Sequence, residues 1–320
     1  MKKILAVILA VLVVGGAVFF LTVLPKTTTI TDYAMNTVIS VTVTSRNCRE
    51  DALAVVDEVR RVESLMSATL PESDIYKINS SKSGTAVSVS DEVYSLLELS
   101  IDISEKTDGV FDISINPLSE LWDFNSENPS VPENEQIKKT LELVNYKDII
   151  LNPEDKTVTL KRKGMSISLG AVAKGYAADC CAELLERRGV KEAIIDLGGN
   201  IYVVGKNKTI GIQTPYEKRG TYFTTCKISD KSVVTSGAYE RYFTEDGKKY
   251  NHILNTATGY PSQMGLKSVT VISKNSALAD GLSTAFFASG EKKAREIAEK
   301  FPGVEVIMLT ENDRTVRLTD

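Results

Sequence analysis

The side chain best suited to move a proton in this chain is His252, the only histidine among 320 residues. Histidine titrates near neutral pH, so a neutral imidazole can accept the proton of a hydroxyl group that is about to react. A lone histidine rules out a histidine-rich metal centre, and any metal is therefore expected to bind oxygen ligands. The alternative interpretation is an ordinary strand or surface histidine.

Asp280 and Thr284 could supply such oxygen ligands, because a spacing of four residues places both on one face of a helix. A carboxylate with a hydroxyl suits a hard cation such as Mg²⁺, whose remaining positions are commonly taken by water and substrate phosphate. The alternative is that Asp280 is only the N-cap of a helix.

Two further segments could contribute to a binding site. Lys174 lies where a helix is expected to begin, and N-terminal amides with a lysine favour an anionic group, although a start rich in Gly and Ala also permits tight packing. Residues 108–124 carry the only Trp together with Phe111 and Phe124. This segment could wall a planar heterocycle or simply pack as an aromatic cluster.

The elements that must position these residues follow from hydrophobic periodicity and turn patterns. Helices are expected at residues 51–65, 277–288 and 291–301. A further helix is expected to begin after Ser90, and another to follow residues 167–170 and end at residues 187–189. Strands are expected at 37–44, 149–151, 157–160, 193–197, 233–234, 239–244, 249–254, 268–273, 304–309 and 315–318. Strands in runs with interspersed helices predict an α+β fold rather than a βαβ repeat.

The N-terminal segment predicts a membrane anchor. Residues 4–24 are twenty-one residues without a charge, preceded by Lys2 and Lys3. At about 1.5 Å per residue such a helix spans a hydrocarbon core about 30 Å thick, whereas a cleaved signal, the alternative, usually has a shorter apolar run. We expect an anchor at 1–25, a linker at 26–32 and one domain at 33–320, outside a bacterial cytoplasmic membrane.

The composition of the chain argues against nucleic acid as a partner and against a cysteine zinc site. The formal net charge is -4 and no basic stripe with interleaved aromatics is present, so nucleic acid is not an expected partner. The four cysteines, among them Cys180 and Cys181, have no zinc-like spacing and are expected to be small buried hydrophobic residues.

Several short blocks, taken in order, resemble the FAD:protein FMN transferase family, also called the ApbE family. The resemblance covers residues 33–290, nearly all of the expected domain. The matching blocks are Met35-Asn36-Thr37, Met66-Ser67 through Asn79, Gly109-Val110-Phe111-Asp112 through Trp122, residues 169–176, Gly198-Gly199-Asn200, Thr235-Ser236-Gly237, His252-Ile253-Leu254 with residues 258–261, and Ala279-Asp280 with Thr284.

The resemblance implies a fold and a set of roles. The fold would be ApbE-like, related to the T-fold, with mixed sheets, flanking helices and an FAD site in a cleft between subdomains. The carbonyl of Ala171 with Asp280 and Thr284 would hold Mg²⁺ at the FAD pyrophosphate, and His252 would activate the acceptor hydroxyl. Flavin-nucleotide contacts would come from Met35, Val110, Phe111, Asp112, Ser168, Lys174 and Ile253.

The implied reaction moves the FMN half of FAD to a Thr or Ser of a client flavoprotein, such as an electron-transport subunit, and releases AMP. The chain departs from the family where Ala68-Thr69-Leu70 replaces a frequent aromatic residue, and at Ser168, Asn255 and Gly281. Two other functions remain open: an FAD pyrophosphatase that transfers FMN to water, and a membrane-tethered flavin-binding protein without turnover.

Overall fold

The computed structural model describes residues 24–218 and 220–318. Its helices, in chain order, are α2 (Cys48–Met66), α3 (Asp74–Ser80), α4 (Asp91–Lys106), η1 (Ile113–Ile115), α5 (Asn116–Trp122), α6 (Asn134–Leu141), η2 (Tyr146–Asp148), α7 (Ala173–Arg187) and α8 (Ser276–Ala298). Its strands are β1 (Lys26–Ala34), β2 (Thr37–Ser45), β3 (Val87–Ser88), β4 (Ile149–Asn152), β5 (Thr157–Leu160), β6 (Glu192–Asp196), β7 (Asn200–Gly205), β8 (Lys208–Gln213), β9 (Tyr222–Ile228), β10 (Lys231–Gly237), β11 (Tyr242–Glu245), β12 (Lys248–Asn251), β13 (Leu266–Ser273), β14 (Glu305–Thr310) and β15 (Thr315–Leu318).

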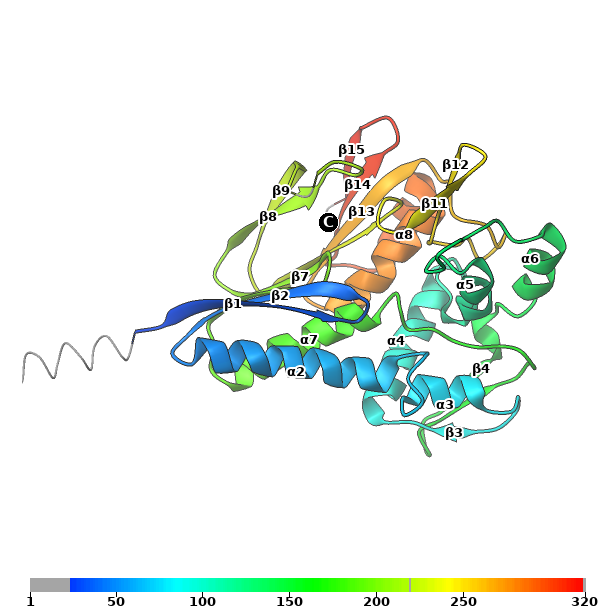
Figure 1. The fold of residues 1–320 in the computed structure, drawn as a ribbon, viewed down its shortest axis with the longest axis horizontal. Helices are drawn as coiled ribbons and strands as arrows, with labels where there is room; N and C mark the ends of the chain where they lie inside the picture. The colour runs from blue at the N-terminus through cyan, green and yellow to red at the C-terminus, as the bar shows by residue number, and fades with distance from the viewer. Residues whose placement is uncertain (1–23, 219, 319–320) are drawn as a thin grey trace, which may run out of the picture.

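An eight-stranded sheet organises the molecule, with the order β1-β2-β6-β7-β10-β13-β14-β15. Every neighbouring pair in it is antiparallel. Figure 1 shows α2 and α7 side by side along one face of this sheet, beneath β1 and β2, with α8 beside β13. A mixed fold with an antiparallel sheet and segregated helices confirms the predicted α+β class.

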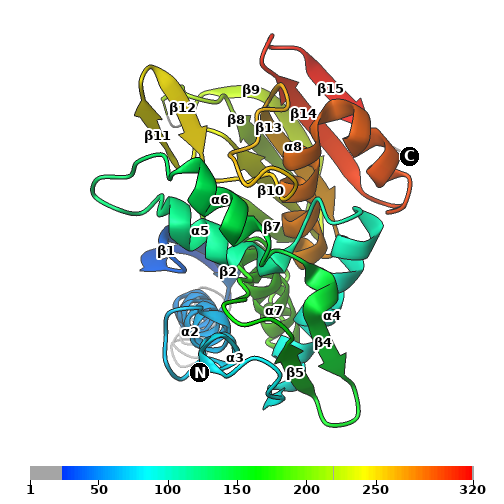
Figure 2. The same ribbon diagram turned by 90° about the vertical axis from the view of Figure 1, so that its right-hand side faces the viewer.

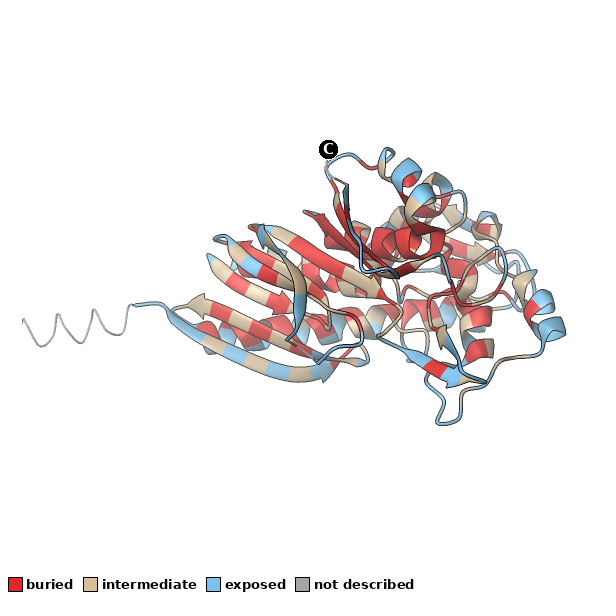
Figure 3. Cartoon of the chain, turned by 90° about the horizontal axis from the view of Figure 1, so that it is seen from above, coloured by how far each residue is buried: buried red, intermediate tan, exposed pale blue. Residues whose placement is uncertain are grey.

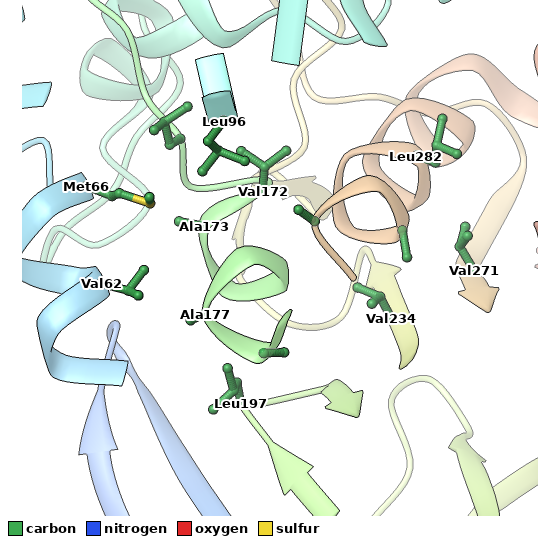
Figure 4. Close-up of a cluster of buried hydrophobic side chains, with 14 of the residues drawn as sticks. Val62, Met66, Leu96, Val172, Ala173, Ala177, Leu197, Val234, Val271 and Leu282 are labelled. Carbon is green, nitrogen blue, oxygen red and sulfur yellow. The ribbon is translucent and has the colours of Figure 1, made fainter. Parts of the chain in front are cut away.

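The main hydrophobic core lies between this sheet and its helices, and α7 runs through the middle of it. Ala173 and Ala177 face Val62 and Met66 of α2, as Figure 4 shows, while Leu282 projects from α8. Small residues on α7 let the neighbouring helices approach closely. The start of α7 is therefore enclosed by packed elements. Figure 3 shows that buried residues concentrate in the interior of the molecule, whereas its outer strands and loops are largely exposed.

Smaller units surround this core. The β8–β9 hairpin covers the opposite face of the sheet through a second cluster that includes Ile210, Ile212 and Ile228. The three-stranded sheet β3-β5-β4 lies near α3 and α4, and the β11–β12 hairpin lies above α5 and α6 in Figure 2. Asp246 and Gly247, both at positive φ, form the predicted turn of that hairpin.

Most predicted elements are confirmed within a few residues, including α2, α4, α7, β13 and the β4–β5 pair. The two helices expected at 277–288 and 291–301 form α8, which is interrupted at Gly290, where φ is 76°. The short helices α3, α5 and α6, and strands β7, β8 and β9, were not predicted, since short segments carry little periodicity.

The expected linker at residues 26–32 is wrong, because these residues form most of β1. Lys26–Ala34 pairs with Thr37–Ser45 along its full length. Threonine hydroxyls also meet across the pair, with Thr27 2.8 Å from Thr44 and Thr29 2.9 Å from Thr42. Threonine is polar enough for a linker, but its branched Cβ suits a strand once a partner is present.

The predicted anchor at 1–25 lies almost wholly outside the described residues. Within residues 24–218 and 220–318, no helix is long and apolar enough to span a bilayer.

Candidate functional site

The site is built where the first turns of α7 and α8 cross. Gly175 of α7 lies so close to α8 that an added Cβ would be 2.3 Å from the carbonyl oxygen of Ser276. The backbone amide of Gly175 donates to Oδ2 of Asp280 at 2.9 Å. In return, Asp179 of α7 accepts hydrogen bonds from the amides of Ser276 and Ala277 at 2.8 and 2.9 Å. Each helix thus supplies a carboxylate to the N-terminal amides of the other.

Asp280 lies inside α8, and the N-cap of that helix is Asn275, whose side chain accepts from the amide of Leu278. The alternative reading of Asp280 as a simple cap is therefore wrong. Its side chain is buried, and burial raises the pKa of Asp280 to about 6, while Lys174 opposes the rise and Glu240 adds to it. A buried carboxylate can bind a cation, and the neighbouring lysine and helix N-terminus can bind the anionic ligand of that cation.

Thr284 lies one turn beyond Asp280, as predicted, and its hydroxyl is 3.3 Å from the Ser236 hydroxyl of β10. Ser236 is also 2.8 Å from Ser283. Ala171 lies in the loop that enters α7, where the amides of Val172 and Ala173 bond to the carbonyl of Leu169. The spacing that placed Asp280 and Thr284 on one helical face is confirmed, whereas ligation by Ala171, Asp280 and Thr284 stays a prediction.

The donor set at this place fits a hard cation that is shared with a phosphorylated ligand. Within the described residues, no group of three or more His, Cys, Asp or Glu side chains could hold a metal. Asp280 would supply a carboxylate, and the other ligands would be neutral oxygens, water or phosphate, a combination typical of Mg²⁺. One buried donor nearby, Nδ2 of Asn200, has no hydrogen-bond partner.

His252 follows β12 and is held by one backbone carbonyl. The carbonyl oxygen of Arg241 is 3.1 Å from the backbone amide of His252 and 3.2 Å from Nδ1 of its ring. Because a carbonyl only accepts, Nδ1 carries the proton, and Nε2 is left as the proton acceptor. Burial, with the charges of Arg241 and Lys174, lowers the pKa of His252 to about 3, so the ring is neutral at physiological pH.

Lys174 connects the two parts of the site. Its charge acts on the Asp280 carboxylate and on the His252 ring, so both groups lie within electrostatic reach of one ammonium. Lys174 lies in the first turn of α7, as predicted, next to Gly175, which donates to Asp280.

The segment predicted to contact flavin is joined to the histidine segment. The hydroxyl of Thr256 donates to the carbonyl of Gly109 at 2.7 Å. Phe111 is buried, and its ring would be 3.7 Å from a Cβ added to Gly281, next to Asp280. Val110 is half-buried and Ile253 is buried against the same core. Gly281 permits this packing, since its added Cβ would be only 2.7 Å from Ile103.

Asp112 and Ser168 are engaged by the protein itself. Asp112 is buried and accepts from the amide and hydroxyl of Ser114, at 2.8 and 2.6 Å, and from the amide of Tyr146 at 2.8 Å. Burial raises the pKa of Asp112 against these bonds. Ser168 accepts from the amide of Gly170. Asp112 therefore holds η1 and η2 together, and a direct ligand contact for it stays a prediction.

Met35 occupies the β1–β2 turn, where both Met35 and Asn36 have positive φ, 51° and 58°. Its amide donates to Oε1 of Glu63 at 2.9 Å. The turn is next to Gly198, whose added Cβ would be 2.0 Å from the hydroxyl of Thr37. A strained methionine held in this way beside a glycine turn is consistent with a binding contact.

Trp122 belongs to the core and does not wall a ligand site. It is 1% exposed, stacks on Phe124 with ring centres 5.7 Å apart, and donates from Nε1 to the carbonyl of Gly259 at 2.8 Å. The alternative reading as an aromatic cluster is confirmed. Its bond to Gly259 helps to fix the turn that follows the histidine segment.

A family model, related sequences and solved structures all connect this chain to the same family. The family model described as "ApbE family" matches residues 35–308. A FAD:protein FMN transferase of Klebsiella pneumoniae is 36% identical over 265 residues, covering 82% of this chain and 84% of the relative. One of Treponema pallidum is 30% identical, covering 88% and 84%. The ApbE protein of Thermotoga maritima superposes with a TM-score of 0.84 at 33% identity, covering 91% and 97%.

The chain belongs to the ApbE family. Its relatives are named transferases, and the chain is an enzyme of that class. The flavin transferase ApbE of Vibrio cholerae has the same fold, with a TM-score of 0.81 at 23% identity over 92% of this chain and 97% of that one. The predicted family and its fold are confirmed.

A large groove in this ApbE protein adjoins the crossing of α7 and α8 at Asp179 and Ala277 but contains none of the site residues predicted from the sequence. It encloses about 870 Å³ between α4, the outer side of α7 and β7, and it is lined by Tyr176, Asp179, Tyr202 and Asp230 among others. Neither His252 nor Asp280 reaches it. The chemistry of the side chains, rather than cavity size, identifies the candidate site.

Besides Asp179, two residues of the site, Asn200 and Glu240, were not assigned a role from the sequence. Asn200 was noted only as part of a matching block, although it lies at the start of β7 beside α8. Glu240 follows β10, and its Oε1 would be 3.4 Å from a Cβ added to Gly199. A single carboxylate or amide carries no periodic pattern, so the sequence pointed to Asn200 only through its matching block and did not point to Glu240.

Proposed function

We propose that this ApbE protein is a Mg²⁺-dependent FAD:protein FMN transferase that links FMN to a Thr or Ser hydroxyl of a client flavoprotein and releases AMP. The observation that carries the proposal is the start of α7, where Lys174 stands next to Gly175, whose amide donates to the buried carboxylate of Asp280 at 2.9 Å. The charge of Lys174 also helps to lower the pKa of His252. A phosphate-binding cation, an anionic substrate and a proton acceptor can meet at one place there.

Asp280 and Thr284, with the carbonyl of Ala171, would hold the cation. Mg²⁺, when bound, would spread the charge that develops on the pyrophosphate during transfer. Lys174 and the amides that begin α7 would hold the phosphates in place. The flavin half would lie toward Met35, Val110, Phe111, Asp112, Ser168 and Ile253.

His252 would accept the proton of the client hydroxyl through Nε2. The hydroxyl oxygen then forms a bond to the phosphorus of the FMN half, and the bond from that phosphorus to the bridging oxygen breaks. The bridging oxygen leaves with the adenylate half, which departs as AMP. Atoms and charge balance without a redox step, because the reaction is a phosphoryl transfer.

The cellular place of this reaction is part of the proposal. The apolar run at residues 4–24, preceded by Lys2 and Lys3, supports an anchor that holds the domain outside a bacterial cytoplasmic membrane. A client in the same compartment, such as an extracytoplasmic part of an electron-transport complex, would be within reach of such a domain.

The test is incubation of the full-length protein with FAD, Mg²⁺ and a candidate client, followed by intact-mass measurement of the client and quantification of AMP. Transfer predicts one FMN per client, on Thr or Ser, and an equal amount of AMP. AMP without labelled client would support the FAD pyrophosphatase instead. Bound FAD without AMP, at any metal concentration, would favour the flavin-binding protein.

A further inference from the structure

Asn200 is a buried amide with an unused donor. It is 1% exposed, at the first position of β7. Its Oδ1 accepts from the hydroxyl of Ser276, the first residue of α8, at 3.0 Å. Its Nδ2 has no partner in hydrogen-bond geometry, a property it shares with only Ser268 Oγ among the buried side-chain atoms of the described residues. A buried donor without an acceptor costs about 1–3 kcal/mol, so its retention calls for an explanation.

The geometry directs this donor toward Asp280. Ser276 and Asp280 are four residues apart, so they lie one turn apart on the same side of α8. With Oδ1 anchored on Ser276, the other end of the Asn200 amide is left to face the next turn. Asp280 is buried in that turn, and its Oδ2 accepts from the amide of Gly175, so its carboxylate lies in the same packed crossing as Ser276 and Asn200.

The backbone of Asn200 is fixed as firmly as its side chain. Gly198 and Gly199, at φ 72° and 96°, form a tight turn, and their amides donate to Oδ1 of Asp196 at 3.0 and 3.1 Å. The carbonyl of Asn200 accepts from the amide of Leu197 at 2.8 Å. A residue held on both sides in this way can set the orientation of a neighbouring carboxylate.

We propose that Asn200 is a positioning residue for Asp280, holding one edge of its carboxylate through Nδ2 so that the carboxylate is presented to the cation of the bound FAD. Asn200 touches neither substrate nor metal in this role. The inference rests on the proposed function, since it assumes that Asp280 is a metal ligand. Hydrogen bonds to ligating carboxylates of this kind orient the ligand and tune metal affinity.

A purely structural role would use only the other end of the amide. In that case Oδ1 would fix the start of α8 through Ser276, and Nδ2 would have no function. The two roles separate in the double variant Asn200→Leu with Ser276→Ala. Replacing both partners of the hydrogen bond by apolar groups of similar size is nearly neutral for stability, whereas the donor to Asp280 is lost. Ser276→Ala alone is the matched control, because it keeps Nδ2.

The experiment measures the thermal unfolding of the full-length protein with FAD while Mg²⁺ is titrated, and then AMP release over the same titration. In the double variant, the Mg²⁺ concentration for the half-maximal shift in Tm is expected to rise roughly tenfold, as for other residues behind metal ligands. The rate at saturating Mg²⁺ is expected to change much less. Ser276→Ala is expected to move the Mg²⁺ midpoint by less than half of that change on a logarithmic scale.

Three results would overturn the inference: an unchanged Mg²⁺ midpoint in the folded double variant, an equal rise in Ser276→Ala, or a loss of rate that saturating Mg²⁺ does not restore. If the double variant does not fold, Asn200→Ala is measured in its place with the same criteria. A parent protein that responds to FAD and Mg²⁺ but labels no client would refute the proposed transfer and leave this inference standing. A parent without any Mg²⁺-dependent shift would refute both.

Discussion

The two halves of the candidate site are built in opposite ways. The metal half lies at the crossing of α7 and α8, where Asp280 is buried and bonded to a backbone amide. The histidine half follows the β11–β12 hairpin, where Tyr242 is 42% exposed and most neighbouring side chains reach solvent. A small substrate can be enclosed by packed helices, but a protein substrate has to approach from outside. This difference supports the proposed division, in which the first half would bind FAD and the second would meet the client.

The strongest way to break this division is Asp280→Ala. Loss of the carboxylate that is proposed to bind the cation is expected to lower AMP release by at least about 10²-fold, since metal charge stabilisation contributes several kcal/mol. The Mg²⁺-dependent rise in Tm with FAD should disappear as well. Asp102→Ala is the control, because Asp102 pairs with Lys106 on the surface of α4. Normal AMP release by Asp280→Ala would contradict the assignment of the metal half.

His252→Ala tests the other half and is expected to separate transfer from binding. Client labelling should fall by about 10²-fold or more, the usual contribution of a positioned proton acceptor. FAD affinity and its dependence on Mg²⁺ should stay within a factor of three of the parent. Intact-mass kinetics of the client and a fluorescence titration of FAD give the two numbers. An equal loss of labelling rate and of FAD affinity would mean that His252 takes part in binding FAD.

Gly175→Ala tests whether the close contact between α7 and α8 is needed for stability and for the dependence on Mg²⁺. Alanine is the better helix former by about 1 kcal/mol. Its Cβ, however, would meet backbone atoms of α8 at 2.3 Å, and overpacking of that kind costs about 1–3 kcal/mol or more. We expect net destabilisation, measured by urea unfolding, together with weaker Mg²⁺ dependence.

Gly281→Ala is the matched control for that change. Its Cβ would meet the ends of the Ile103 and Val172 side chains, which can rotate, rather than backbone. A smaller loss of stability is therefore expected than for Gly175→Ala. Equal losses would mean that the backbone contact between α7 and α8 is not what limits the site.

The smallest expected effect is the response of transfer to mild acid. The pKa of His252 is lowered to about 3, mainly by burial, so the ring stays neutral well below its usual value of 6.5 and becomes charged only as the pH falls toward 3. At saturating Mg²⁺ and FAD, the rate of client labelling should fall less than about twofold between pH 7.5 and 5.5, where an unshifted histidine would lose about tenfold. A midpoint near 6.5 in the parent that is absent from His252→Ala would show that the ring is solvated in the working enzyme.

The sequence predicted the helical part of the site better than the rest. Asp280 and Thr284 were placed correctly because a four-residue spacing has a single geometric meaning on a helix. The β1 strand was missed, since Lys26–Ala34 becomes a strand only by pairing with Thr37–Ser45. Asp179 and Asn200 were missed for a related reason: their partners at Ser276 are 97 and 76 residues away. Hydrogen bonds of that range leave no periodic trace in a sequence.

Asp179 of α7 and Asp280 of α8 each accept from the first turn of the other helix, and this affects when the site can form during synthesis of the chain. Gly175 and Asp280 are 105 residues apart, and Asp179 reaches the start of α8 across a similar span. A nascent chain that ends before α8 therefore lacks Asp280, which accepts from the amide of Gly175 and is the proposed ligand of the cation. Closing so long a loop is slow relative to forming either helix alone. Flavin bound with its cation would then be a late product of folding, and its presence would report that the whole domain is complete.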